Sequence, residues 1–403
     1  MGNRKNGALL LSSIAISNLG EWVYFIALNL IVLELTQSPF AVSILYILSP
    51  IANIIISFWA GSWIDRLNQK RMMVFLDIFR GGCVLLLAFS SSLLVIYVVS
   101  FFIYMANAVF TPTSMVYMTK MVPETNRQRF NALKNFVQSC GFLLGPSIAG
   151  VLFMIGTPEM AIKINAFALF SSATLLFFLP TMVRQREVIE KVSFHVIKKD
   201  WVRIYHFTKS AKFLTVIYLL FSGVTLLMSA IDSLEAAFST SVLGLSNSEY
   251  GFLVSIAGLG IVLGAILNTI FSKNLRLGHL MSGGAIFTAV GYIIYATSHQ
   301  FTAAAIGFFL LTFAFSFANT GFLTFIQEEI PNEIMGRFIS IFNVFESIGI
   351  ILLTIIFGIG AQLISLQFTV IIGSIILLGI SLGILYNVLK TRNNQMGINL
   401  KER

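Results

Sequence analysis

Two stretches of this 403-residue chain, MVPETNRQRFNALKNFVQSCGFLLGPSIAG (residues 121–150) and EIPNEIMGRFISIFNVFESIGIILLTIIFG (residues 329–358), align without gaps at an offset of 208. Nine of the 28 positions from 123 to 150 are identical in the second stretch, more than two unrelated apolar helices usually share. The identical pairs include Pro123/Pro331, Arg129/Arg337, Phe130/Phe338, Asn135/Asn343, Ser139/Ser347, Gly141/Gly349 and Gly150/Gly358. The chain therefore contains an internal repeat that spans about half its length.

The composition indicates what kind of helix is repeated. Apolar residues make up 57% of the chain and charged residues only 11%, against about a quarter in an ordinary soluble domain. This excludes a soluble globular enzyme, a disordered chain and a disulfide-stabilised secreted domain. Apolar runs long enough to cross a bilayer are expected at residues 8–35, 40–63, 72–91, 95–121, 130–155, 160–182, 213–237, 250–271, 279–298, 301–327, 337–362 and 366–389. We predict an all-α membrane protein with twelve transmembrane helices in two parallel six-helix repeats.

The basic residues predict the orientation in the membrane. Of the 26 Lys and Arg residues, 22 lie in the two tails and the breaks that would be cytoplasmic if the N-terminus is inside. The expected external breaks, residues 36–39, 92–94, 156–159, 238–249, 299–300 and 363–365, contain none. Because positive loops stay in the cytoplasm, we expect a multi-pass plasma-membrane protein with both termini inside. The net charge of +9 is dispersed over these loops and does not indicate a nucleic-acid partner.

One long connection divides the chain. Residues 1–182 form the expected N-terminal bundle and residues 213–403 the C-terminal bundle with a short tail. Between them, residues 183–212 include IKKDWVRIYHFTKSAK, which mixes basic with aromatic and aliphatic side chains. That mixture is typical of a helix on a membrane surface, so we expect a cytoplasmic linker with an amphipathic helix.

Few residues suit metal or cofactor chemistry. The two cysteines, Cys83 and Cys140, lie apart in apolar segments, and the four histidines are scattered. The chain has no CxxC or HExxH spacing and no GxxxxGK[ST] phosphate loop. We therefore expect no metal, no cofactor and no built-in ATPase, and we do not expect an enzyme.

Two motifs carry a family resemblance. GSWIDRLNQKR (residues 61–71) resembles the signature G-x-x-x-D-R-x-G-R-R of the major facilitator superfamily, with Asn68 in place of the second Gly. GFLLGPSIAG (residues 141–150) resembles the antiporter motif G-x-x-x-G-P-x-x-G-G, with Ala149 in place of one Gly. With twelve expected helices and a long central connection, the resemblance covers the whole chain. Gly20-Glu21, the Thr36–Pro39 break and Gly336-Arg337 resemble the macrolide-efflux type branch of drug exporters.

The resemblance implies residues that control conformational change. These are Gly61, Asp65, Arg66, Arg71, Gly141, Gly145, Pro146, Gly150 and Arg337. Asp65 would face the positive end of the helix that begins near Arg337 and hold the cytoplasmic side shut. Gly141 and Gly145 would allow a close helix contact and Pro146 a bend. The alternatives are that the basic residues only set orientation and that Pro146 is an ordinary kink. Many proton antiporters of the superfamily carry an Arg in the fourth helix, and this chain has none there.

Polar residues within the expected spans are candidates for a transport site, because a charge at the bilayer centre costs about 2.5–3.5 kcal/mol. The carboxylates are Glu21, Asp232 and Glu346, and the neighbouring polar or aromatic candidates are Asn18, Phe25, Asn29, Gln138 and Asn343. Asn18, Glu21, Phe25 and Asn29 share one face of the first helix at 100° per residue. Each carboxylate either binds protons or cations or is a buried structural acid. Asp77 and Arg80, three residues apart, are expected to form a structural ion pair.

Three functions follow in order of preference. The first is a secondary transporter that exports hydrophobic or cationic drugs in exchange for protons by alternating access. The second is an exporter of one metabolite such as a siderophore. The third, a membrane enzyme or receptor, has no supporting motif. We expect a small-molecule substrate, protons and the lipid bilayer as partners, and a monomer.

Overall fold

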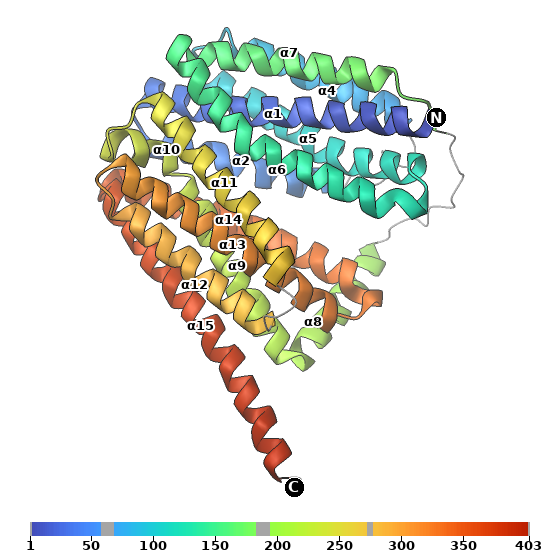
Figure 1. The fold of residues 1–403 in the computed structure, drawn as a ribbon, viewed down its shortest axis with the longest axis vertical. Coiled ribbons are helices and arrows are strands. Elements are labelled where there is room, and N and C mark those ends of the chain that lie inside the picture. Colours follow the sequence, from blue (N-terminus) through green and yellow to red (C-terminus); the bar gives the residue numbers. More distant parts are fainter. Residues whose placement is uncertain (1, 58–67, 183–193, 272–276, 402–403) are drawn as a thin grey trace. The chain divides into compact units, whose positions relative to one another are not determined.

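The computed structural model describes residues 2–57, 68–182, 194–271 and 277–401, and these residues contain helices and no strand (Figure 1). The first half contains α1 (Gly2–Thr36), α2 (Pro39–Ser57), α4 (Gln69–Leu87), α5 (Leu93–Met121), α6 (Glu124–Ile155) and α7 (Pro158–Phe177). The connection contains α8 (Phe194–Ser210). The second half contains α9 (Lys212–Asp232), α10 (Glu235–Ala237), the π-helix η1 (Phe238–Val242), α11 (Asn247–Phe271), α12 (Leu277–Ala296), α13 (Phe301–Glu329), α14 (Asn332–Leu363) and α15 (Leu366–Lys401).

The helix boundaries repeat at the offset found in the sequence. The helices α2, α4, α5, α6 and α7 begin at residues 39, 69, 93, 124 and 158, and α11, α12, α13, α14 and α15 begin 208 residues later in each case. The pairs α5/α13 and α6/α14 also end 208 residues apart. The repeat therefore extends over five successive helices, far beyond the 30-residue stretch in which the sequence reveals it.

Eleven of the described helices are long and apolar enough to cross a membrane. The remaining long helix of the first half, α4, has 19 residues that include Lys70, Arg71, Asp77 and Arg80. Helix α4 is long enough to cross a membrane, but it carries more charged residues than any of the eleven apolar spans. It contacts α5 and α7, and two of its four charged side chains are buried.

One predicted span is interrupted near its end. The expected span 213–237 ends earlier, at Asp232, and the expected external break 238–249 begins with the π-helix η1. Within this segment the Thr240 hydroxyl donates to the Ala236 carbonyl at 2.9 Å. This bond satisfies the hydroxyl inside the segment, so the polar side chain is compatible with a helix. The helix is thus interrupted directly after a predicted site carboxylate.

Packing divides the chain into two compact units. Unit 1 comprises Met1–Arg186 and Ser233–Gly258, and unit 2 comprises Glu187–Asp232 and Leu259–Arg403. Within unit 1, α6 meets the first part of α11 through glycines: a Cβ on Gly251 would lie 2.8 Å from the Gly150 Cα, and the Ser147 and Ser255 hydroxyls are 2.7 Å apart. Small residues at such a contact let two membrane helices approach closely.

Unit 2 uses the same device between α12 and α13. A Cβ on Gly284 would lie 2.5 Å from the Ala318 backbone nitrogen, and one on Gly291 would lie 2.5 Å from that of Leu311. From α13, Gly307 faces the backbone of Tyr295 and Gly321 that of Met281. Because these glycines recur every seven or fourteen residues on each helix, the close contact continues along both.

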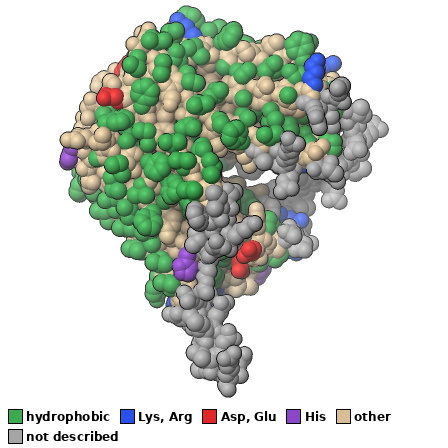
Figure 2. Space-filling view, in the orientation of Figure 1, with side chains coloured by type: hydrophobic (Ala, Val, Ile, Leu, Met, Phe, Trp, Pro, Cys, Tyr) green, Lys and Arg blue, Asp and Glu red, His purple; other side chains and the backbone are tan. Residues whose placement is uncertain are grey.

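The surface is largely apolar. Figure 2 shows hydrophobic side chains over most of the visible face, with few charges among them. Many phenylalanines point outward, and Phe75, Phe89 and Phe167 expose 65%, 75% and 74% of their surface. A soluble protein rarely carries so continuous an apolar surface, whereas the hydrocarbon of a bilayer would cover it.

Candidate functional site

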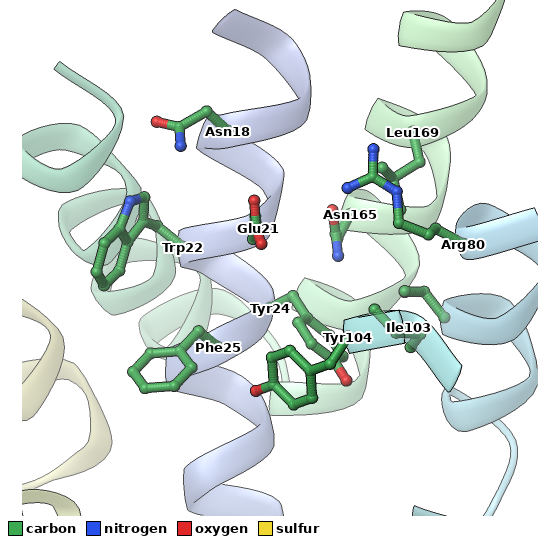
Figure 3. A pocket seen from close by; sticks show the side chains of 11 residues that line it. Asn18, Glu21, Trp22, Tyr24, Phe25, Arg80, Ile103, Tyr104, Asn165 and Leu169 are labelled. Carbon is green, nitrogen blue, oxygen red and sulfur yellow. The ribbon is translucent and has the colours of Figure 1, made fainter. Parts of the chain in front are cut away.

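A cavity of about 300 Å³ lies inside unit 1 beside α1 (Figure 3). Its lining residues are Asn18, Glu21, Trp22, Tyr24, Phe25, Arg80, Val84, Ile103, Tyr104, Asn165 and Leu169, from α1, α4, α5 and α7. Three of the residues predicted from the polar face of α1, namely Asn18, Glu21 and Phe25, therefore share one cavity. Its volume is at the lower end of the range for small-molecule sites.

The Glu21 carboxylate is linked to a buried arginine through one amide. The Asn107 side-chain amide on α5 donates to Glu21 Oε1 at 2.8 Å, and Arg80 Nη1 on α4 donates to Asn107 Oδ1 at 3.1 Å. Asn107 thus uses its donor for the acid and its acceptor for the base. This bridge connects α1, α4 and α5. The Arg80 guanidinium is joined to Glu21 through one intervening side chain, that of Asn107.

Arg80 is fixed from its other side as well. Its Nη2 pairs with Asp77, whose second oxygen accepts from the Ser172 hydroxyl at 2.6 Å. The guanidinium lies over the Phe110 ring, 4.5 Å from its centroid, an arrangement that favours a cation. Asp77 and Arg80 are almost fully buried. The ion pair expected from the sequence is therefore present, and it is joined to the Glu21 cavity.

The charges in this cluster do not cancel. With Glu21 and Asp77 ionised and Arg80 protonated, two negative charges face one positive charge. A buried charge without a partner costs several kcal/mol, so the cluster favours one added positive charge. A proton on Glu21 or a cation beside it would supply this charge.

Aromatic rings line the cavity beside α1. The Trp22 ring meets Phe25 edge to face at 5.8 Å between centroids and Phe142 at 4.4 Å, and Phe25 meets Tyr46 at 5.4 Å. In Figure 3 the Trp22 and Phe25 rings lie on one side of Glu21, while Asn165 and Arg80 lie on the other. Aromatic faces attract organic cations, so the wall and the carboxylate favour the same kind of ligand.

The glycines of the antiporter-like motif seat the α1 side chains. A Cβ on Gly141 of α6 would lie 1.8 Å from Asn18 Oδ1, and a Cβ on Gly145 would lie 2.4 Å from the Trp22 Cβ. In the second repeat Gly349 faces Leu226 in the same way, at 2.9 Å, and both partners are offset by 208. Gly141 and Gly145 thus shape the cavity without lining it.

Gly141→Ala should lower the thermal stability of the purified protein, because the new methyl group overlaps Asn18 Oδ1. Overpacking of this kind costs about 1–3 kcal/mol. Asn18→Ala should restore stability when combined with Gly141→Ala, a coupling that a double-mutant cycle measures. Gly379→Ala is the matched control, since its Cβ would meet no atom within 4 Å. If Gly141→Ala and Gly379→Ala lower the thermal stability equally, Gly141 is not needed to accommodate the Asn18 side chain.

The two other candidate carboxylates lie in unit 2. The Tyr292 hydroxyl of α12 donates to Asp232 Oδ1 at 2.6 Å, at the end of α9 where the helix is interrupted. The Thr225 hydroxyl of α9 donates to Glu346 Oε1 on α14 at 2.6 Å. At the repeat offset Ser229 corresponds to Glu21 and Thr288 to Arg80. The charged cluster therefore has no counterpart in the second repeat.

The remaining predicted residues are dispersed. Asn29 is fully buried and does not line the cavity, and its amide has no hydrogen-bond partner among the described residues. Gln138 and Asn343 are exposed, as are Arg71 and Arg337. Gly61, Asp65 and Arg66 lie outside the described residues, so the structure does not address the contact expected for Asp65.

Several residues of the site were missed in the sequence. The sequence alone does not place Asn107, Ser172, Tyr24, Tyr104 or Asn165 in this site. A signal was available in Arg80 and Asn165, which are polar residues in the middle of helices that must cross a membrane. The fourth expected helix, α5, has no Arg, but Arg80 of α4 reaches its Asn107.

The described residues contain no group of three or more His, Cys, Asp or Glu that could hold a metal ion. The polar groups that line the cavity are carboxylate, guanidinium, amide and phenol. Such groups can hold and exchange protons and bind a polar small molecule.

Comparison with known proteins adds the family. Residues 10–354 match the Major Facilitator Superfamily. YfiS of Bacillus subtilis strain 168, an uncharacterized MFS-type transporter, is 26% identical over 348 residues, which cover 83% of this chain and 82% of YfiS.

Solved structures share the fold. A variant of the nucleoside transporter NupG gives a TM-score of 0.77 at 13% identity and covers 95% of this chain and 99% of its own. A bacterial homolog of the human lysosomal transporter Spinster, inward-facing and unoccupied, gives 0.74 at 14% identity, covering 96% and 98%. At these identities the likeness shows the fold alone.

The predicted fold class, an all-α membrane protein with twelve helices in two six-helix repeats, is confirmed by this likeness and by the helices of the structure. The comparisons do not reach the macrolide-efflux branch, which stays a prediction. The family match extends over most of the helical part of the chain. The chain is a multi-pass membrane transporter and belongs to the major facilitator superfamily.

Proposed function

We propose that this transporter exports hydrophobic organic cations in exchange for protons, and that both ligands bind at Glu21. The observation that carries the proposal is the Glu21 carboxylate in a cavity with aromatic walls and one excess negative charge. A cation and a proton each neutralise that charge, so they compete for it. Competition at one group couples two fluxes by linkage.

The buried pair of Asp77 and Arg80 has a separate part in this scheme. It holds Asn107 in the orientation that donates to Glu21. When Glu21 is ionised this hydrogen bond stabilises the charge, and charge-assisted bonds are about twice as strong as neutral ones. Asp77 and Arg80 therefore act as positioning residues, while Glu21 is the group that exchanges its ligand.

Transport in reconstituted vesicles tests the proposal. Protein in proteoliposomes should accumulate a cationic aromatic dye when the compartment that receives the dye is made acidic, and collapse of the pH gradient should release it. In one-for-one exchange the limiting dye ratio is about tenfold for each pH unit, since a unit corresponds to about 1.4 kcal/mol. Accumulation that persists without the gradient, or that follows an imposed Na⁺ gradient instead, would refute proton exchange.

The orientation is also part of the proposal. We expect both termini in the cytoplasm of the cell, in the plasma membrane, and a monomer. In a Cys-free background, Gln37→Cys and Ser241→Cys should react with an impermeant thiol reagent in intact cells, whereas Asn126→Cys should react only after lysis. All three side chains are exposed. Labelling of Asn126→Cys in intact cells would contradict the predicted orientation.

A further inference from the structure

Helix α8 packs against other helices of unit 2 along one side. Ile204 is 3% exposed, the Phe207 ring meets Phe338 of α14 at 6.1 Å, and the Trp201 ring meets Phe345 of α14 at 5.7 Å. Only Ala211 separates α8 from α9, and its backbone N–H donates to the Phe207 carbonyl at 2.8 Å. Helix α8 is therefore held at the ends of two membrane-spanning helices.

Beside this packed side, α8 has an open face that is both aromatic and basic, and Trp201 lies at the border between the two. Trp201, Val202 and Tyr205 expose 43%, 48% and 63% of their surface. At 100° per residue these three residues lie within about 100° of arc, and Lys209 lies inside the same arc. Arg203 and Lys212 are exposed beside it. We call Trp201, Val202, Arg203, Tyr205, Lys209 and Lys212 the α8 strip.

We propose that the α8 strip binds the headgroups of anionic phospholipids. The described charged side chains from Trp201 to Lys212 are all basic, so they complement phosphate and not a cationic surface. Exposed Trp and Tyr prefer the level of the headgroups, where an apolar ring and a polar edge are both accommodated. The strip is continuous with the start of α9, whose 21 residues from Lys212 to Asp232 are long and apolar enough to cross a membrane, so we expect the lipid surface within its reach.

The expected strength follows from the charges. A basic residue close to an anionic membrane surface contributes about 1 kcal/mol, which is about fivefold in affinity. Three basic residues on one strip should therefore enrich anionic lipid at Trp201 clearly above its bulk fraction. The enrichment should weaken as salt is added, because it is electrostatic.

Quenching of Trp201 by brominated lipid tests the inference. The full chain with Trp22→Phe, Trp59→Phe and Trp63→Phe retains Trp201 as its single tryptophan. In mixed vesicles, brominated phosphatidylglycerol should associate with Trp201 at least about fivefold more strongly than brominated phosphatidylcholine at the same mole fraction. Replacing Arg203, Lys209 and Lys212 together by Gln should bring this ratio to about one. The matched control, Arg71→Gln with Lys120→Gln and Lys390→Gln, removes three exposed basic residues elsewhere and should leave the ratio unchanged.

A second measurement uses the native chain and does not depend on the folding of any variant. Amide hydrogen exchange across residues 201–212 should be slower in nanodiscs that contain phosphatidylglycerol than in nanodiscs of phosphatidylcholine alone. Equal quenching by the two lipids, no quenching by either, or a preference that survives loss of the three basic residues would each overturn the proposal. So would exchange rates that do not depend on the headgroup.

Discussion

Purified Glu21→Gln protein in proteoliposomes should bind a cationic aromatic dye weakly and fail to accumulate it against its gradient. Gln keeps the oxygen that accepts from Asn107, so the bridge to Arg80 should remain. It cannot bind a proton, and the cluster no longer has an excess negative charge. Under a gradient of two pH units, the accumulation ratio should fall from about 100-fold to about one.

A matched variant separates coupling from general damage. Glu159→Gln also removes one carboxylate, but from an exposed position in the first turn of α7, and it should accumulate dye like the unaltered protein. If Glu21→Gln pumps normally, Glu21 is a structural acid. The same measurement should then be made with Asp232→Asn and Glu346→Gln, whose carboxylates accept from Tyr292 and Thr225.

The second large effect concerns stability. Arg80→Gln should lower the free energy of unfolding by about 3–5 kcal/mol, because it leaves the Asp77 carboxylate buried without its cation. Asp77 is fully buried and retains only the Ser172 hydroxyl as a partner in the described network. Denaturant-induced unfolding in detergent, followed by circular dichroism, measures the change.

The double variant Asp77→Asn with Arg80→Gln should recover most of that loss, since no carboxylate at position 77 is then buried without its cation. Arg71→Gln is the control: it removes a positive charge from the same helix at an exposed position and should cost less than about 0.5 kcal/mol. If Arg80→Gln and Arg71→Gln are equally stable, the pair does not hold this region together. Since transport also depends on the Asn107 bridge, the double variant should be stable and yet slow in transport.

The fold could be predicted from the sequence because two features that determine it, the apolar runs and the internal repeat, can be read directly from the order of the residues. A run of apolar residues long enough to span a bilayer fixes each helix, and the repeat from residues 121–150 to 329–358 fixes the grouping. The helical state of residues 238–242 could not be predicted. A polar run such as Ser239, Thr240 and Ser241 is equally compatible with a loop and with a helix in which the Thr240 hydroxyl bonds a carbonyl of the preceding turn.

The site could be predicted only in part, for a different reason. The 100° periodicity places Asn18, Glu21 and Phe25 on one face of α1, and the structure brings these three to one cavity. Periodicity within one helix does not state which residue of another helix faces it. The bridge through Asn107 joins positions 86 and 27 residues apart in the chain, and nothing in the spacing of those residues identifies it.

The contact of Gly141 with Asn18 and that of Gly349 with Leu226 have a historical consequence. Both partners are shifted by the same 208 residues, and we infer that the contact dates from a single six-helix gene that was duplicated and fused. Asn18 and Leu226 have since diverged around an unchanged glycine, and the charged cluster is present in one copy only. The two copies therefore differ in the residues around a shared helix contact. Ancestral reconstruction of the unfused half should yield a protein that assembles as a pair.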